Sequence, residues 1–466
     1  MKIHNDSSVA RTTIIRPARA RDQRSRWISA LAACLCVACG SGESQDQQGP
    51  REPASAQVVA QLEPPANIPS LPAPAPAETP PTFAVAQPPP DGPTPLRPTK
   101  GTGAIDADAL APSVLRQTVS KGVVEVTDLR VVPSDGTAFV LERSRGLSAL
   151  SALRERSIVF APKDLVSADG AGMLGLALSP QFDRDRRVYV FMTSSLGPTP
   201  SNRVVRLTLD ATLAKVVARE DVLIGIPFAK PSTTQPKETR HLGGRMALGP
   251  DEKLYVATGD GYLADAPQTR SELAGKVLRL EQPAGSATPG FMQPRVVAVG
   301  LRDAAGIAFH PNHEAIIVAD RGGALIDEIN VLTVDANAGW DPRCAGTAFD
   351  YCGDLSSGEK LVPMNTTNAA LPSWQSSKSG SGLANMALLR GPHWRQWNGA
   401  LALVFDAGQR IDLVKLDHGN KVVRQATVVS GLGYGFSAID QGPDSLYVAT
   451  RGKPGGDEIV RLTMMY

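Results

Sequence analysis

A histidine and an aspartate separated by one predicted strand are the residues best placed for catalysis. His241 stands on a glycine-rich loop, and Asp260 ends the turn that follows the apolar segment Leu254–Thr258. A rigid strand between loop and turn points both side chains toward a shared pocket. Imidazole suits a proton acceptor because its ordinary pKa lies near neutrality. The segment predicts a base and an acid in one pocket; a loop histidine without a role and a turn-capping aspartate are the alternatives.

Other chemistry-bearing groups are few, because the chain has only six histidines and five cysteines. Cys344 and Cys352 close a short loop, which in an exported protein predicts a disulfide. A metal site at this loop would need further ligands nearby. The sequence has no Gly-x-Ser-x-Gly nucleophile turn, no zinc-type histidine pair and no phosphate-binding glycine loop before a helix.

The elements that must position these groups are short strands in a regular repeat. From about residue 110, a proline-containing turn precedes an apolar strand at Pro133, Pro180, Pro250, Pro311 and Pro443. The intervals are 47, 70, 61 and 132 residues, and the segment Trp397–Phe405 supplies a unit inside the last one. Further strand patterns cover residues 203–209, 276–280, 410–416 and 458–462.

Six such units predict an all-β fold, a six-bladed β-propeller. A single blade has two apolar faces and cannot bury both, whereas neighbours packed around a ring cover them. Loops at one end of the ring then converge on the central axis, where a ligand site belongs.

The N-terminus has the features of an export signal. A basic stretch, residues 1–26, is followed by an apolar run from Trp27 to Cys39 that is too short to span a membrane as a helix. Small residues precede Cys34 and Cys39, and both places resemble a bacterial lipobox. We favour lipidation at Cys39 because a polar tether follows; a plain secretory signal is the alternative. This predicts an exported, periplasmic or outer-membrane-anchored lipoprotein that meets the membrane only through its lipid.

Composition divides the chain into three parts. Residues 1–39 form the signal and lipobox, residues 40–110 a disordered linker rich in Pro and Ala, and residues 111–466 the propeller. The linker has too few large apolar residues to offset the entropy of ordering, and its prolines make it a semi-rigid spacer. Residues 1–26 carry a charge of +5, so the remainder of the chain carries −3. A slightly acidic body gives no reason to expect nucleic-acid binding.

Five segments between about residue 115 and the C-terminus resemble, in order, blocks of the soluble quinoprotein glucose/sorbosone dehydrogenases. These segments are Gly172–Phe182, Arg240–Asp260, Leu273–Arg279, Gly300–Phe309, and Asp327–Asn330 followed by Ala336–Trp340. The resemblance implies a six-bladed propeller that binds pyrroloquinoline quinone (PQQ) and Ca²⁺ at its axis. The implied reaction is oxidation of an aldose to a lactone, with electrons passed to a dye- or cytochrome-type acceptor.

The resemblance also implies roles for individual residues. His241 matches the base that takes the anomeric hydroxyl proton, Asp260 an acid near the cofactor, and Arg302 an arginine over the quinone. Gly322 and Gly323 fall where backbone carbonyls hold the catalytic calcium. Glu328 and the carbonyl of Ala338 match a second, structural calcium, for which backbone and carboxylate oxygens are ordinary ligands. A surface ion pair for Arg302 and a solvated carboxylate for Glu328 are the alternatives.

The sequence departs from the family where PQQ is usually held. The family places a lysine before a Gly-Gln pair, but here Asp406 and Ala407 occupy that place. The segment Gly435–Ser437 replaces an Arg-x-Arg pair. Burying a tricarboxylate without cationic partners is costly, and Arg410 or Arg451 are the candidates to compensate. Asp303 and Ala305 also replace an asparagine and a glutamine.

Arg321 stands where a neutral residue is common beside calcium, and a cation there would repel Ca²⁺ unless its side chain turns away. Two alternatives to the dehydrogenase therefore remain. One is a non-catalytic sugar- or protein-binding propeller that has lost PQQ affinity, and the other is a calcium-dependent lactone hydrolase. The hydrolase would need carboxylate and asparagine ligands clustered on the axis, which the sequence does not clearly provide.

Overall fold

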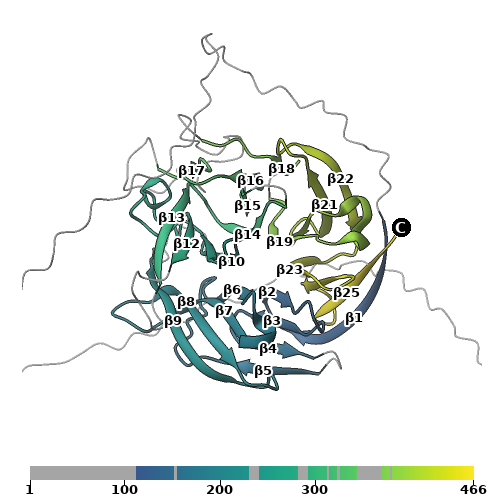
Figure 1. Ribbon diagram of the computed structural model, residues 1–466, viewed down its shortest axis with the longest axis horizontal. Coiled ribbons are helices and arrows are strands. Elements are labelled where there is room, and N and C mark those ends of the chain that lie inside the picture. Colours follow the sequence, from purple (N-terminus) through teal and green to yellow (C-terminus); the bar gives the residue numbers. More distant parts are fainter. Residues whose placement is uncertain are drawn as a thin grey trace, which may run out of the picture. The chain divides into compact units, whose positions relative to one another are not determined.

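The computed structural model describes residues 112–151, 155–229, 241–281, 292–311, 314–322, 326–343, 369–377 and 380–466. Strands predominate in these ranges (Figure 1). The helices are α1 (Phe182–Asp185), η1 (Ala266–Gln268) and η3 (Pro392–Trp397). No helix of the described segments has the length and apolar character needed to cross a bilayer. The predicted signal, the linker, Cys39, Gly323, Cys344 and Cys352 lie outside the described residues.

The strands form six sheets around a central axis, so the predicted six-bladed β-propeller is confirmed (Figure 1). Blade 1 contains β2 (Val126–Val131), β3 (Ala138–Glu142), β4 (Gly146–Leu150) and β5 (Arg156–Phe160). Blade 2 contains β6 (Met173–Leu178), β7 (Arg187–Ser194), β8 (Ser201–Leu209) and β9 (Val216–Ile226). Blade 3 contains β10 (Gly243–Leu248), β11 (Leu254–Thr258), β12 (Lys276–Glu281) and β13 (Gln293–Val299), with β17 (Ala336–Asn337) added in parallel.

The second half of the ring repeats this pattern. Blade 4 contains β14 (Ala304–Phe309), β15 (Ile316–Asp320), β16 (Glu328–Leu332) and β18 (Trp374–Gln375). Blade 5 contains β19 (Leu383–Leu388), β20 (Leu401–Phe405), β21 (Arg410–Leu416) and β22 (Val422–Val429). Blade 6 contains β23 (Gly435–Gln441), β24 (Leu446–Arg451), β25 (Asp457–Met465) and β1 (Ser113–Val123).

Blade 6 closes the ring with strands from both ends of the described chain. β1 runs antiparallel to β25, with Ser113 opposite Met465 and Val123 opposite Asp457. Backbone hydrogen bonds between the two strands hold the first and last blades together, so opening the ring requires breaking this ladder.

The core lies between neighbouring blades. Phe139 and Leu141 of blade 1 cluster with Leu176 and Val190 of blade 2, and all four side chains are buried. The clusters between the other blades are built in the same way. Each predicted proline turn joins the first strand of a blade to its second, which explains why the repeat is legible in the sequence. Removing apolar surface from water on both faces of every blade stabilises the ring.

Every blade has a β-bulge at the same place on its first strand. In blade 1, Val126 pairs with Glu142 and Asp128 with Leu141, so Thr127 is an extra residue. The corresponding extra residues of the other blades are Leu174, Gly244, Ala305, Ala384 and Ser437. The bulges lie where the first strands begin, and we call this end of the ring the site end. A bulge leaves the backbone groups of its extra residue outside the hydrogen-bond ladder. These groups can therefore form hydrogen bonds with other groups near the axis.

Candidate active site

His241 lies at the site end, just before β10. Gly243 and Gly244 have φ values of 58° and 91°, and a Cβ on Gly244 would lie 2.4 Å from the Phe191 ring. Only glycine accommodates both the backbone conformation and this close approach. His241 is 4% exposed and stacks on Tyr262 with ring centroids 4.2 Å apart. The glycine pair therefore lets the loop that carries the histidine pack closely against the sheet.

Asp260 joins His241 to two other elements. Its Oδ1 lies 3.1 Å from His241 Nδ1 and accepts a hydrogen bond from the Tyr262 backbone nitrogen at 2.9 Å. Its Oδ2 accepts a hydrogen bond from Trp340 Nε1 at 2.7 Å. The side chain is fully buried, and the backbone nitrogen of Asp260 donates to the carbonyl of Arg302 at 2.8 Å. The predicted base and acid are therefore in direct contact, and both side chains are buried.

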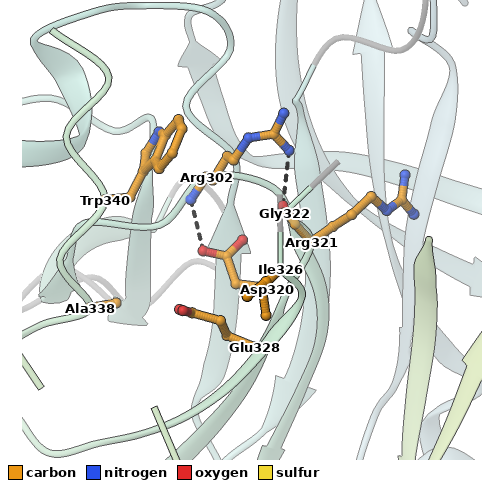
Figure 2. Close-up of a pocket in the computed structure, with 8 residues that line it drawn as sticks. All are labelled: Arg302, Asp320, Arg321, Gly322, Ile326, Glu328, Ala338 and Trp340. Carbon is orange, nitrogen blue, oxygen red and sulfur yellow. Dashed lines mark hydrogen bonds between the residues drawn. The ribbon is translucent and has the colours of Figure 1, made fainter. Parts of the chain in front are cut away.

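Arg302 completes this cluster from the start of blade 4. Its guanidinium lies 5.4 Å from the Trp340 ring centroid, and its Nη1 donates to the carbonyl of Arg321 at 2.9 Å. Its backbone nitrogen donates to Asp320 Oδ2 at 2.9 Å (Figure 2). Arg302 is 4% exposed, so the alternative of a surface ion pair is wrong. His241, Asp260, Trp340 and Arg302 form a continuous cluster, which we call the histidine cluster.

A small cavity beside Arg302 holds two carboxylates. Its volume is about 20 Å³, and its lining includes Asp320, Gly322, Glu328 and Ala338. Burial, with smaller contributions from Glu328 and Asp303, raises the pKa of Asp320 to about 7. Burial also raises the pKa of Glu328, assisted by the charge of Asp327. Two carboxylates that resist ionisation in one small cavity would be stabilised by a cation between them.

The donor set of this cavity suits a cation held partly by backbone. Among the described residues, no group of three or more His, Cys, Asp or Glu side chains could hold a metal. Asp320 and Glu328 would therefore need carbonyl oxygens beside them, a mixture that Ca²⁺ accepts. Figure 2 shows the Arg321 guanidinium extending away from both carboxylates. The repulsion expected from a cation at position 321 is therefore reduced.

A second cavity, of about 50 Å³, opens onto the axis at the site end. Residues of the first strands of blades 1 to 4 line it, and its charged lining residues are Arg143, Arg245, Asp303 and Arg321. Asp303 Oδ1 accepts from the Gly243 backbone nitrogen at 3.2 Å, and its Oδ2 lies 3.6 Å from Arg321 Nη1. Three cations and one carboxylate make this lining positive. We call this space the axial cavity.

Arg245 has a structural role in the axial cavity. Its Nη1 donates to the carbonyls of Thr127 at 2.6 Å and Leu174 at 3.1 Å, and its Nη2 donates to that of Ala384 at 3.0 Å. All three are extra residues of bulges, in blades 1, 2 and 5. Asp128 lies 3.6 Å away as a counter-charge. Arg245 thus satisfies carbonyls that the bulges leave without ladder partners.

The two arginines predicted to compensate in the late blades lie in different surroundings. Arg410 Nε donates to Asp412 at 2.8 Å, and its guanidinium lies 3.9 Å from the Phe405 ring centroid. Arg410 lines neither of the two cavities. Arg451, the other predicted candidate, lies 3.3 Å from Asp406 at the site end of β24.

Three site residues were not assigned from sequence. Asp320 ends a buried strand shortly before a glycine pair, and this position is the signal that could have identified it as a site residue. Trp340 closes the Ala336–Trp340 segment, but nothing local indicates its bond to Asp260, 80 residues away. Arg143 follows β3 without any motif, so only the closed ring reveals its place at the axis.

Residues 125–461 match the family described as Glucose / Sorbosone dehydrogenase. The chain belongs to this family. It is 28% identical over 225 residues to Quinoprotein glucose dehydrogenase B of Acinetobacter calcoaceticus, a match covering 42% of this chain and 45% of that protein. It is 26% identical over 290 residues to Aldose sugar dehydrogenase YliI of Escherichia coli, covering 60% and 74% respectively. These matches place the chain among sugar dehydrogenases, which are oxidoreductases.

A solved structure has the same fold. The PQQ-bound form of Aldose Sugar Dehydrogenase from Streptomyces coelicolor superposes with a TM-score of 0.59 at 23% identity. The superposition covers 76% of this chain and 99% of that one. At this identity the likeness concerns the propeller itself, and the chemistry must be argued from the residues of this chain.

Proposed function

We propose that this protein oxidises the anomeric hydroxyl of an aldose to a lactone, with PQQ as its cofactor and a dye- or cytochrome-type acceptor for the electrons. The observation that carries the proposal is the His241–Asp260 pair, held at 3.1 Å beside Arg302 in a member of the glucose/sorbosone dehydrogenase family. The quinoprotein and PQQ-bound names of its relatives support the choice of cofactor.

His241 is the proposed base. A carboxylate only accepts hydrogen bonds, so Asp260 favours the tautomer with the proton on Nδ1 and the lone pair on Nε2. His241 Nε2 would take the anomeric hydroxyl proton, and Asp260 would stabilise the imidazolium that forms. Donation from Tyr262 and Trp340 keeps the Asp260 carboxylate fixed while this happens.

The residues present fit a tricarboxylate cofactor. PQQ, when bound, would supply the acceptor for the two electrons that leave the anomeric carbon. Arg143 and Arg321 line the axial cavity and can offset the cost of burying carboxylates. Arg302 is the proposed group for offsetting negative charge that develops on reduction. Asp260, which is fully buried, would orient His241 beside the cofactor.

We assign Ca²⁺ to two places. The carbonyls of Gly322 and Gly323 would hold the catalytic ion, which would act as a Lewis acid. Glu328 and the carbonyl of Ala338 would hold a structural ion, and Asp320 adds a carboxylate there. Chelation should lower the melting temperature of the wild type, and adding Ca²⁺ back should restore it. Glu328→Gln should lose most of that calcium-dependent shift, and an unchanged shift would remove Glu328 from the site.

The function is tested with the purified chain stripped of calcium. The protein is titrated with PQQ in the presence of Ca²⁺ and followed by absorbance, and dye reduction is then measured with a panel of aldoses. Saturable binding with sugar-dependent dye reduction is expected. A folded protein that binds no PQQ overturns the proposal.

The second candidate is a non-catalytic propeller that binds sugar or protein. It is favoured by the absence of the family's cations in the late blades, where Asp406 and the Gly435–Ser437 segment stand instead. Sugar binding measured by calorimetry without any PQQ binding would select this function.

We also propose that the protein is exported and anchored through lipid on Cys39. The basic, apolar and small-residue segments of the N-terminus support this. Cys39→Ser should move the protein from the membrane fraction to the soluble fraction, whereas Cys34→Ser should not. The reverse pattern would assign the lipid to Cys34, and no shift in either variant would leave a plain secretory signal.

A further inference from the structure

Three arginines occupy equivalent places in three different blades. The bulge on the first strand of a blade defines an equivalent place on the second strand. On the second strand, one residue pairs with the first-strand residue just before the bulge, and the residue that follows it in the chain lies at the site end. From blade 1 to blade 6, the residues at this place are Arg143, Thr193, Gly259, Arg321, Asp406 and Arg451. We call Arg143, Arg321 and Arg451 the arginine trio. Ring symmetry brings them together although 308 residues separate the first from the last.

All three arginines lie at the site end, and two of them reach the axial cavity. Arg143 and Arg321 are lining residues of this cavity. Burial lowers the pKa of Arg143, and repulsion from Arg451 and then Arg321 adds to the effect. An anion placed among these arginines would relieve the repulsion, so their common place at the site end suits a ligand with negative charge.

The protein's own carboxylates neutralise the trio incompletely. Arg321 Nη1 lies 3.6 Å from Asp303, and Arg451 Nη1 lies 3.3 Å from Asp406. Arg143 Nη1 donates to the Gly170 carbonyl at 2.7 Å. The Nε of Arg143 is buried and has no hydrogen-bond partner among the described residues. The carboxylates beside Arg321 and Arg451, and the single carbonyl beside Arg143, therefore leave positive charge at the site end.

Arg245 shows what a structural arginine looks like in the same cavity. Both of its Nη atoms donate to bulge carbonyls, and Asp128 lies beneath it as a counter-charge. Its Nη donors are directed at the backbone of three blades, and only its Nε, like that of Arg143, is buried without a partner among the described residues. The side chains of Arg321 and Arg451 are instead 28% and 30% exposed and lie at the site end. Arg143 is also part-exposed, whereas Arg245 is 7% exposed, so the trio is more accessible to a ligand than Arg245 is.

We propose that Arg143, Arg321 and Arg451 together bind the carboxylate groups of an anionic ligand at the site end of the axial cavity. Under the proposed function these carboxylates belong to PQQ, so the inference then rests on that function. A sugar acid is the other source of the same chemistry. The trio, from blades 1, 4 and 6, would then bind the carboxylates that the family binds with cations at other positions of blades 5 and 6.

The test compares PQQ binding by Arg143→Gln, Arg451→Gln and the wild type, measured by quenching of tryptophan fluorescence with no substrate present. Arg461→Gln is the matched control: Arg461 lies in the same blade as Arg451, pairs with Asp444, and its side chain is 34% exposed. Arg321→Lys is a milder variant that keeps a charge where Arg321 Nε donates to the Leu383 carbonyl. The trimethyl ester of PQQ, which lacks the negative charges, is the second probe.

We expect each glutamine variant to weaken PQQ binding about tenfold or more, as for the loss of a charged hydrogen bond. Arg461→Gln should bind as the wild type does, and the ester should bind weakly and equally to all variants. Tight PQQ binding by both glutamine variants would overturn the trio while leaving the dehydrogenase intact.

A wild type that binds no PQQ would overturn the proposed function, and glucuronate and glucose then decide the trio. Preference for glucuronate that is lost in Arg143→Gln and Arg451→Gln would support a sugar-acid ligand. No preference would overturn the trio as well.

Discussion

The histidine cluster and the arginine trio lie at the same end of the ring but are built on different principles. In the histidine cluster, His241, Asp260 and Trp340 are buried and joined by hydrogen bonds of 2.7–3.1 Å. In the trio, part-exposed arginines face carboxylates at 3.3–3.6 Å and one another. The first region is internally satisfied, whereas the second retains positive charge.

This difference separates two tasks of one site. A base must be held in one tautomer and one orientation before the substrate arrives, so its partners are supplied by the protein. A ligand-binding region gains affinity from groups that the protein leaves incompletely neutralised. Changes in the histidine cluster should therefore affect turnover, and changes in the trio should affect cofactor affinity.

The largest effect is expected from His241→Ala. Loss of the base should reduce sugar-dependent dye reduction by about 10³-fold, within the range for general base catalysis. PQQ affinity should stay nearly intact because the trio is untouched. Steady-state kinetics and fluorescence titration measure the two quantities on one preparation. Loss of cofactor binding together with folding would give His241 a structural role and break the comparison.

Asp260→Asn should lower kcat by about 10²-fold with little change in PQQ affinity. An asparagine can present its amide nitrogen to His241 Nδ1, which favours the wrong tautomer. The steady-state kcat and a thermal unfolding scan are the measurements, and Asp251→Asn on an exposed turn of the same blade is the control. A variant that is as active as the wild type would show that Asp260 only caps its turn.

Arg245→Met should lower the free energy of unfolding by about 3 kcal/mol, because it leaves three bulge carbonyls without their buried donor and removes one of the two arginines beside Asp128. Arg321→Met should cost less than about 1 kcal/mol, because that side chain is part-exposed. Urea denaturation of both variants measures the difference. Equal losses would abolish the distinction between the structural arginine and the trio.

The last effect concerns pH, is smaller than that of Arg245→Met, and lies away from both regions. Burial raises the pKa of Asp440 to about 6, whereas nearby Arg130 opposes the shift. The folded state therefore favours the protonated acid, and stability falls as pH rises from about 4 to about 6. As pH falls through this window, the free energy of unfolding of the wild type should rise by about 1–2 kcal/mol relative to that of Asp440→Asn. The partial exposure of Asp440 keeps this gain below the full value of the pKa shift. Urea titrations at several pH values measure this. An identical pH dependence in the two proteins would contradict it.

Local patterns made much of the fold predictable. Proline turns followed by apolar strands predicted the first-to-second strand connection of five blades, because turn chemistry and strand periodicity are both short-range properties. The pairing of His241 with Asp260 was predictable for a related reason, since a single strand and its flanking loops determine their separation. The predicted role of Arg410 was drawn from its place near the missing lysine, and the structure adds its contacts with Phe405 and Asp412, which the sequence did not predict.

Contacts between blades were not predictable in this way. Trp340 reaches Asp260 from 80 residues away, and Arg245 bonds to carbonyls of blades 1, 2 and 5. Sequence spacing carries no signal for such pairs, because their distance depends on how many blades close the ring.

The sequence by itself determined the family, the six-bladed architecture and the glycine loop that carries His241, because each rests on residues close together in the chain. Only the tertiary structure decided which cations gather at the axis. Closure of the ring through β1 and β25 brings equivalent positions of distant blades together, and Arg143, Arg321 and Arg451 become neighbours for that reason.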